Sequence, residues 1–176
     1  MVAILVNLLA ALGIPKADFI GFSIGGGIVQ YLAYTYPQLV NKLILAGTQS
    51  GIGPGVVLPP REVLESAGVN NDQTPTEEDM MKLFFYPSGT SLALGHGRGS
   101  VTAHRDFKFT TDTSTFDWLT DIKAPVLVTN GHTEIMSPTS NSFVLQQEIP
   151  NAQLHLYPDA GHGHLFQVPE LYAKYH

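Results

Sequence analysis

Ser23 stands in the tightest turn that this sequence predicts, where a hydroxyl group could act as a nucleophile. It lies in Gly21-Phe22-Ser23-Ile24-Gly25, a G-x-S-x-G pattern directly after an apolar run and directly before an apolar helical pattern. Such an elbow pushes the serine hydroxyl out of the backbone, and its glycines let the helix pack closely against the strand. The elbow also aims the backbone N–H of Ile24 at a developing oxyanion. The simpler alternative is that glycines and a serine only make a good strand-to-helix connection.

A serine needs a base and an orienting carboxylate before it can attack a carbonyl carbon. His162, in PDAGHGHLF, follows the fourth predicted strand, and Glu134, in NGHTEIMSP, follows the third. We predict Ser23 as nucleophile, His162 as base and Glu134 as acid, because side chains at the carboxyl ends of parallel strands meet at one edge of a sheet. His164 is the alternative base. Asp159 is closer to His162 in sequence, but we expect it to cap a turn.

The spacing of the histidines does not favour a metal site. His162 and His164 form a pair to which His155 or His132 could be added, but no further ligand is placed by spacing to complete a site. The chain contains no cysteine, which excludes disulfides, thiolate ligands and a cysteine nucleophile. We therefore predict neither a metal nor a cofactor.

Short apolar runs that alternate with helical patterns must position these residues. Alternation of this kind is typical of an α/β fold, a parallel sheet with helices on both faces. The fourth run alternates apolar and polar residues, which favours a place near the edge of the sheet. The predicted strands are 17–22, a short buried strand, then 41–48, 124–131 and 152–158; the predicted helices are 25–36 and 138–149.

The first residues, MVAILVNLLAALGIP, are apolar but lack the basic leader and the cleavage site of a signal peptide. They are also too few to span a bilayer. We interpret residues 2–13 as a buried helix that ends at Gly13 and Pro15. The corresponding expectation is a cytoplasmic protein without a membrane partner.

Residues 49–120 differ in character from the segments on either side, and we expect them to form a small cap over the carboxyl ends of the strands. The flanking segments 1–48 and 121–176 would then be the two parts of one core. The cap contains a capping-box pattern, TPTEED, before MMKLFFYP, and a Gly-rich stretch, SGTSLALGHGRGS. Its apolar residues suggest a small substrate that is itself apolar. Arg98 and Arg105 could meet a carboxylate, but solvation or pairing with acidic neighbours is the simpler expectation.

Composition narrows the class of protein further. The chain has 176 residues, of which 44% are hydrophobic and 14% charged, which suits one globular domain and argues against disorder. Its formal net charge is −6 and it contains no basic run. A nucleic-acid or anionic-membrane partner is therefore not expected.

Two segments carry a resemblance to a known family. GFSIGGGIVQYLAYTYPQLVNKLILAGT and PVLVTNGHTEIMSPTSNSFVLQQEIPNAQLHLYPDAGHGHLFQ resemble the α/β-hydrolase superfamily, in particular its cofactor-free esterase, lactonase and haloperoxidase-like branch. The resemblance implies a serine hydrolase with Ser23, His162 and Glu134 as its triad. A serine at the elbow also disfavours the members that use an aspartate nucleophile. Relatives usually carry aspartate where this chain has Glu134, whose extra methylene moves the carboxylate by roughly 1.5 Å, so its loop must compensate.

A second departure supports an alternative. Members of the superfamily have further strands before the elbow, whereas a single predicted helix precedes it here. The strand before Ser23 would then leave an edge of unpaired backbone groups. On this alternative the chain is a non-catalytic hydrolase fragment that forms a homodimer through that edge or binds a partner there. A third hypothesis is a lyase, or cofactor-free oxygenase-like chemistry, with His162 as base and no acylation of Ser23.

Overall fold

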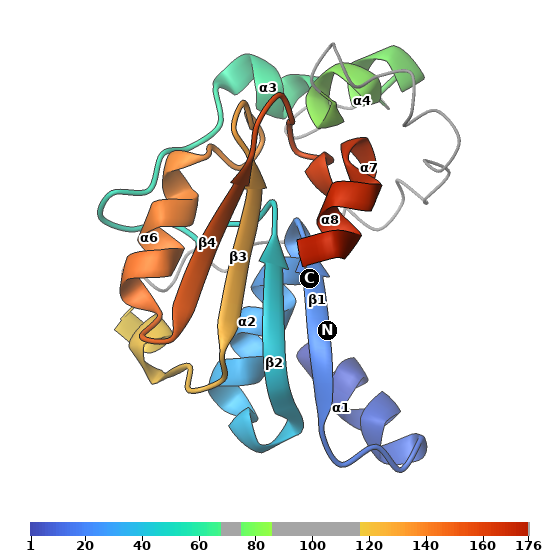
Figure 1. Ribbon diagram of the computed structural model, residues 1–176, viewed down its shortest axis with the longest axis vertical. Coiled ribbons are helices and arrows are strands. Elements are labelled where there is room, and N and C mark those ends of the chain that lie inside the picture. Colours follow the sequence, from blue (N-terminus) through green and yellow to red (C-terminus); the bar gives the residue numbers. More distant parts are fainter. Residues whose placement is uncertain (68–74, 86–116, 176) are drawn as a thin grey trace.

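The computed structural model describes residues 1–67, 75–85 and 117–175 and contains one parallel sheet of four strands. The strands lie in chain order, β1-β2-β3-β4, and all three neighbouring pairs are parallel (Figure 1). Partners across the sheet include Ile20 with Ile44, Leu45 with Val128 and Thr129 with His155. The predicted α/β fold is confirmed, as is the place of the fourth strand at an edge. The strand bounds are β1 Ala17–Phe22, β2 Val40–Ala46, β3 Val126–Gly131 and β4 Ala152–Tyr157.

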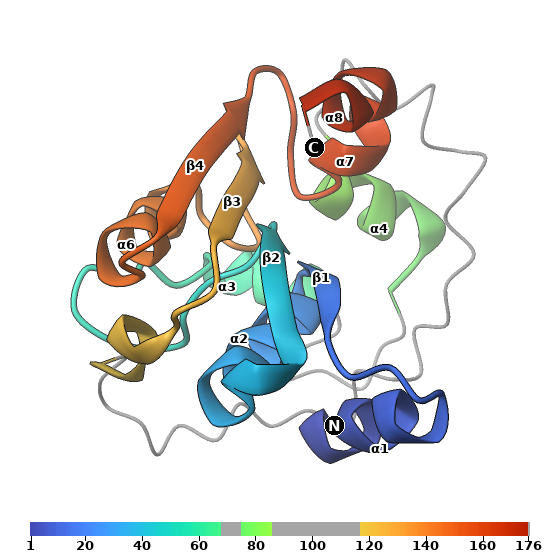
Figure 2. The same ribbon diagram turned by 60° about the horizontal axis from the view of Figure 1, so that its bottom comes forward.

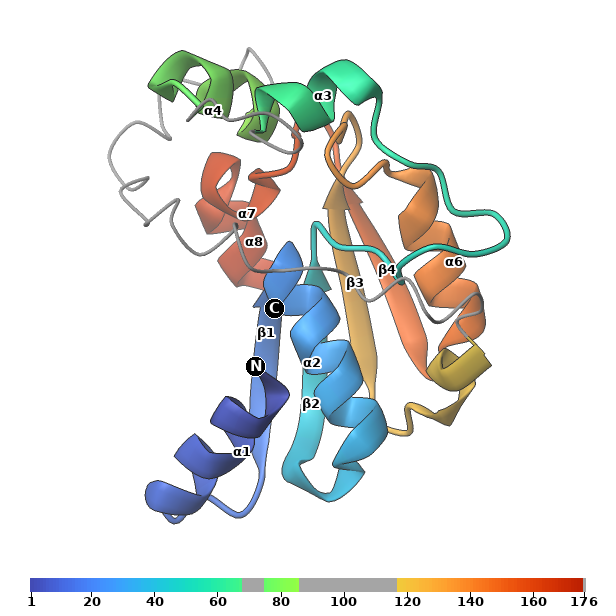
Figure 3. The same ribbon diagram turned by 180° about the vertical axis from the view of Figure 1, so that it is seen from behind.

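Helices cover both faces of this sheet. Seen from behind, α2 and α6 lie over one face (Figure 3), where α2 packs on β1 and β2, and α6 packs on β3 and β4. The C-terminal helix α8 lies on the opposite face, where the ring of its Tyr172 is 5.6 Å from that of Tyr157 on β4. The helices are α1 Val2–Ala11, α2 Ile24–Thr35, α3 Arg61–Ser66, α4 Glu77–Phe84, α6 Ser140–Glu148, α7 His164–Gln167 and α8 Pro169–Tyr175, with 3₁₀ turns at Pro37–Leu39 and Asp117–Asp121.

The hydrophobic core lies between the sheet and the face formed by α2 and α6. Alternate residues of β2 and β3 point into it, and helical residues at core spacing meet them. Full burial of each such side chain contributes about 1.5–3 kcal/mol relative to exposure. Its central members, all buried, are Leu32, Leu43, Leu45, Val126, Val128 and Leu145.

Two expectations of burial were wrong. Leu9 is the one buried residue of α1, whereas Ile4, Leu8 and Leu12, the residue that follows the helix, are 68%, 50% and 61% exposed. The apolar sequence of α1 divides at helical spacing into a stripe that packs on the core and a stripe, at every fourth residue, that faces outward. Strand β1 was expected to be buried, but it lies at the sheet edge and its Ile20 is 62% exposed.

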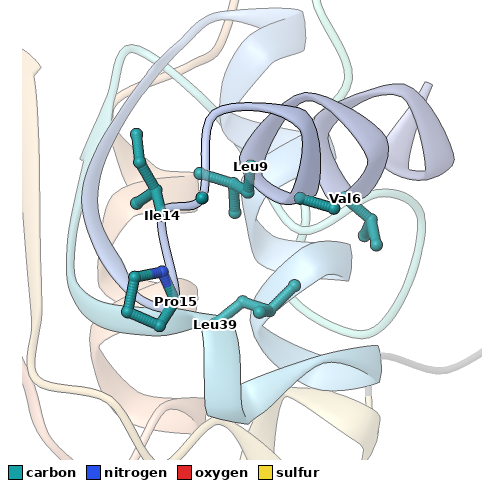
Figure 4. A pocket seen from close by; sticks show the side chains of 7 residues that line it. Val6, Leu9, Ile14, Pro15 and Leu39 are labelled. Carbon is teal, nitrogen blue, oxygen red and sulfur yellow. The ribbon is translucent and has the colours of Figure 1, made fainter.

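An apolar pocket of about 370 Å³ lies beside α1 (Figure 4). Helix α1 itself lies at the end of the sheet opposite to the strand arrowheads (Figure 1). The pocket is lined by Val6, Leu9, Ala10, Gly13, Ile14, Pro15 and Leu39.

The longest described helix, α2, has 12 residues, so none of the described helices could cross a bilayer.

Helices α3 and α4 lie beyond the carboxyl ends of the strands (Figure 1). The predicted capping box begins α4: Thr76 Oγ1 accepts from the backbone N–H of Asp79 at 3.1 Å, and the Asp79 carboxylate accepts from that of Thr76 at 3.0 Å. Asn141 of α6 ties the loop before α3 to the core, because it donates to the carbonyl of Val57 at 2.8 Å and accepts from its N–H at 2.7 Å. The Gly-rich stretch, Arg98 and Arg105 lie outside the described residues.

Candidate active site

The turn between β1 and α2 has the backbone geometry that a nucleophile elbow requires. Ser23 has φ 54° and ψ −123°, a positive-φ backbone conformation that residues other than glycine rarely adopt. A Cβ atom at Gly21 would overlap Val29 and the backbone of α2, and one at Gly26 would overlap Thr48. The same atom at Gly25 would meet open space, so the second tight glycine is Gly26, not the Gly25 of the sequence pattern.

Ser23, His162 and Glu134 lie in one hydrogen-bonded chain. His162 Nε2 is 2.9 Å from Ser23 Oγ, and His162 Nδ1 is 2.8 Å from Glu134 Oε2. Because a carboxylate only accepts, Nδ1 carries the proton and Nε2 presents a lone pair to the serine hydroxyl. His162 is 1% exposed, and the carboxylate beside it is equally shielded from water. The three predicted residues are therefore placed as a nucleophile, a base and an orienting acid require.

The loop after β3 is shaped around the longer side chain of Glu134. Glu134 Oε1 accepts from the backbone N–H groups of Met136 and Ser137, the latter at 2.8 Å, so both of its oxygens are occupied. Asn130, the penultimate residue of β3, is fully buried and donates to the Ser137 carbonyl at 3.1 Å. These bonds hold a charged carboxylate in a buried place and turn its other oxygen toward His162.

The loop that carries His162 is held on both sides of the histidine. Gly161 N–H donates to Gln167 Oε1 at 2.8 Å, and Gly163 N–H donates to the carbonyl of Phe84, the last residue of α4, at 2.6 Å. Figures 1 and 2 show α4 beside α7 at this end of the molecule. Helix α4 is thus bonded directly to the loop of the predicted base.

Aromatic rings surround the imidazole of His162. The ring centroids of Phe22 and Phe84 are each 4.9 Å from it, and Phe166 packs edge-on against Phe22 at 5.8 Å. Sequence reasoning missed Phe84 and Asn130 as parts of this site. A polar Asn inside an otherwise apolar strand was a usable signal, whereas the contact between Phe84 and His162, 78 positions apart, left none.

Ile24 is the first residue of α2, so its N–H has no intrahelical partner and lies at the positive end of the helix dipole. That position matches the predicted oxyanion donor. Its use by a substrate oxygen stays a prediction.

The other predicted candidates lie outside this chain of contacts. His164 is fully buried, and its ring bonds Thr129 and the backbone of His162 in place of Ser23. Asp159 is exposed in the turn after β4 and has φ 51°. Within residues 1–67, 75–85 and 117–175, no three His, Cys, Asp or Glu side chains gather where a metal could bind.

Comparisons with known proteins agree with the observed fold. Residues 1–168 match the model of the alpha/beta hydrolase fold family. The chain is 29% identical over 164 residues to a poly(3-hydroxyalkanoate) depolymerase of Ectopseudomonas oleovorans, covering 87% of this chain and 56% of that protein. It is 31% identical over 176 residues to a 2-hydroxy-6-oxononadienedioate/2-hydroxy-6-oxononatrienedioate hydrolase of Paraburkholderia phymatum, covering 90% and 60%.

Solved structures have the same fold. A putative non-heme bromoperoxidase, BpoC, from Mycobacterium tuberculosis gives a TM-score of 0.76 at 23% identity, over 99% of this chain and 70% of that one. The meta-cleavage product hydrolase CumD from Pseudomonas fluorescens gives 0.74 at 22% identity, over 97% and 66%. The chain spans less than two thirds of the length of the curated relatives named above. With the family model matched over almost its whole length, the chain belongs to the alpha/beta hydrolase fold family.

Proposed function

We propose that this chain carries the active site of a serine hydrolase that cleaves an ester, a lactone or a similar carbonyl compound through an acyl-enzyme. The observation that carries the proposal is the continuous hydrogen-bonded chain from Ser23 through His162 to Glu134, with the serine at a positive φ. The names of its relatives support hydrolysis in general, since the relative from Paraburkholderia phymatum is named a hydrolase and the one from Ectopseudomonas oleovorans a depolymerase.

In the first half of the reaction, Ser23 Oγ attacks the carbonyl carbon while its proton passes to His162 Nε2. Glu134 stabilises the imidazolium that results, and the N–H of Ile24 donates to the oxyanion of the tetrahedral intermediate. When the carbon–oxygen bond to the leaving group breaks, His162 returns the proton to the departing alkoxide. An acyl group then remains esterified to Ser23.

In the second half, a water molecule gives a proton to His162 Nε2 and its oxygen attacks the acyl carbon. The new tetrahedral intermediate collapses, the proton returns to Ser23 Oγ, and a carboxylic acid leaves. The products are an acid and an alcohol, or one hydroxy acid from a lactone.

The surroundings of His162 favour a substrate with an apolar acyl or ring-bearing part. Phe22 and Phe84 present aromatic rings beside the imidazole, and Phe85 follows Phe84 at the same end of α4. Apolar surface buried against such rings contributes up to about 0.8 kcal/mol, or fourfold in kcat/KM, for each methylene group. We expect longer acyl chains to react faster until they fill the site.

Stopped-flow hydrolysis of p-nitrophenyl esters with acyl chains of two to eight carbons tests both parts of the proposal. We expect a burst of up to one equivalent of nitrophenol per chain, followed by slower turnover, and neither should occur in Ser23→Ala. Phe84→Ala should reduce the preference for long chains without abolishing the burst. Turnover that survives in Ser23→Ala would contradict the acyl-enzyme and favour a mechanism in which His162 acts as base alone.

A further inference from the structure

His164 is a second buried histidine in the loop of the predicted base, and the proposed reaction does not use it. Its side chain is fully buried, two residues after His162. Its Nδ1 is 3.3 Å from the carbonyl oxygen of His162, and its Nε2 is 3.0 Å from Thr129 Oγ1 on β3. We propose that His164 is a positioning residue that fixes the backbone of His162 to strand β3. The inference rests on the proposed function, in which His162 is the base.

The chemistry of the partners fixes the direction of each bond. A carbonyl oxygen only accepts, so His164 Nδ1 carries the proton and donates to the backbone of His162. In the neutral ring Nε2 then accepts, and the hydroxyl of Thr129 is its donor. Tyr172 OH lies 3.4 Å from Thr129 Oγ1 and can donate to that oxygen in turn. A proton on Nδ1 of His164 fits the bonds to both the His162 carbonyl and the Thr129 hydroxyl.

Aromatic rings hold the plane of the His164 ring. The ring of Tyr157, on β4, stacks on it at 5.5 Å between centroids with an angle of 26°, and the ring of Tyr172, on α8, lies at 5.8 Å and 56°. Burial raises the pKa values of both tyrosines, as expected for hydroxyl groups in a poorly hydrated place. The imidazole of His164 therefore has little freedom to rotate away from either hydrogen-bond partner.

The contact with the His162 carbonyl is one of several attachments of this loop, whose Ala160 carbonyl also accepts from the N–H and hydroxyl of Thr133 at 3.0 and 2.9 Å. Gly161 and Gly163 are each held through their N–H groups, by Gln167 and by Phe84. The attachment through His164 differs from those of Gly161 and Gly163 because the ring of His164 also bonds Thr129, a residue of β3.

Strand β3 also carries the loop of Glu134, through Asn130 and its bond to the Ser137 carbonyl. Two neighbouring residues of β3 therefore hold the two loops: Thr129 bonds His164 in the loop of the base, and Asn130 bonds the loop of the acid. A displacement of the base by about 1 Å can cost on the order of 100-fold in rate, so attachment of both loops to one strand matters for catalysis.

Three variants separate positioning from simple filling of space. In His164→Asn the amide nitrogen takes roughly the place of Nδ1 and can still donate to the His162 carbonyl. In His164→Gln the amide reaches the place of Nε2 and can bond Thr129, but the donor to His162 is lost. His164→Phe keeps the aromatic ring between the tyrosines and removes both bonds. Thermal unfolding of all three gives the matched measure of stability.

We expect the Asn variant to keep the wild-type rate of reaction with a fluorophosphonate to within about threefold. In the Gln and Phe variants, the rate of this reaction should fall on the order of 10- to 100-fold. In ester hydrolysis, the same variants should have a lower kcat and an unchanged KM. Thr129→Val should slow the fluorophosphonate reaction when it is made in the wild type. It should slow the reaction little further when it is made in His164→Asn, because that variant no longer uses the hydroxyl of Thr129. The inference would be overturned if the Asn and Gln variants lost the same factor in reaction rate and these losses followed their losses of thermal stability.

A measurement without turnover keeps the inference separate from the proposed function. The proton on His162 Nδ1, in its bond to Glu134, should give a downfield ¹H NMR signal that persists in His164→Asn and broadens or shifts in His164→Gln. If the wild type fails to react with the fluorophosphonate, the proposed function fails, and this comparison of signals still decides the role of His164. An unchanged signal in both variants would show that His164 does not position His162.

Discussion

His162 Nδ1 and Glu134 Oε2 are 2.8 Å apart in the structure, in a contact shielded from water. The contact uses one oxygen of a carboxylate whose other oxygen is bound by two backbone N–H groups of its own loop. The extra methylene of glutamate, expected to require compensation, is thus accommodated by the turn at Met136 and Ser137. This site is built for glutamate.

The first prediction concerns that fit. In Glu134→Asp the shorter side chain cannot reach His162 while it keeps both backbone bonds, so the rate should fall on the order of 10- to 100-fold. In Glu134→Gln the charge that stabilises the imidazolium is lost, and kcat should fall by about 10³ to 10⁴ with KM little changed. Steady-state kinetics of the two variants provides the measurement. An Asp variant as active as the wild type would mean that the loop does not select glutamate.

The second prediction concerns Gly25 and Gly26, the first two of three consecutive glycines at the start of α2. A Cβ at Gly26 would overlap the side chain of Thr48, and one at Gly25 would meet open space. Gly26→Ala should therefore lower the free energy of unfolding by about 1–3 kcal/mol, as overpacking does. Gly25→Ala should raise it by up to about 1 kcal/mol, because alanine favours the helix. Urea unfolding of the pair measures this contrast, and equal effects would contradict the close approach of α2 to Thr48.

The third prediction concerns alkaline pH. Burial, and then the neighbouring Tyr172 and Tyr175, raise the pKa of Tyr157 from 10.0 to about 12. The unfolded chain therefore loses this proton more readily than the folded one, so stability from Tyr157 is complete below pH 10 and is lost as the pH rises toward 12. The loss should be on the order of 2 kcal/mol.

Tyr157→Phe is the matched control for the third prediction. It keeps the ring that stacks on His164 and removes the titrating hydroxyl. We expect the unfolding free energy of the wild type to fall relative to that of this variant between pH 10 and pH 12. Parallel curves over that interval would show that Tyr157 is not the group responsible.

Much of the architecture could be predicted from local patterns. The four strands were found because each is a short apolar run bounded by Gly, Pro or polar residues, and the bounds of 17–22 agree with β1. Since all four strands are parallel, the loops that follow them meet at one edge of the sheet. That rule, together with the G-x-S-x-G pattern and the order of the serine, the acid and the histidine along the chain, was enough to bring Ser23, Glu134 and His162 together.

What could not be predicted depends on contacts between distant segments. The apolar sequence of α1 is similar on all sides, so it did not reveal that Leu9 faces the core and Ile4 faces outward. The G-x-S-x-G pattern pointed to Gly25, but the space at Gly26 is decided by Thr48, which lies on another element. The bond that Gly163, in the loop of His162, donates to the Phe84 carbonyl likewise follows from the position of α4, which local propensity does not encode.

The proposal that Ser23 is a nucleophile activated by His162 can be tested by intact-mass analysis after treatment with a fluorophosphonate. We expect one adduct per folded chain, none in Ser23→Ala, and markedly slower formation in Glu134→Gln. Circular dichroism of each sample confirms that folded protein is compared. A folded wild-type chain that gains no adduct, or a Ser23→Ala variant that gains one, would contradict it.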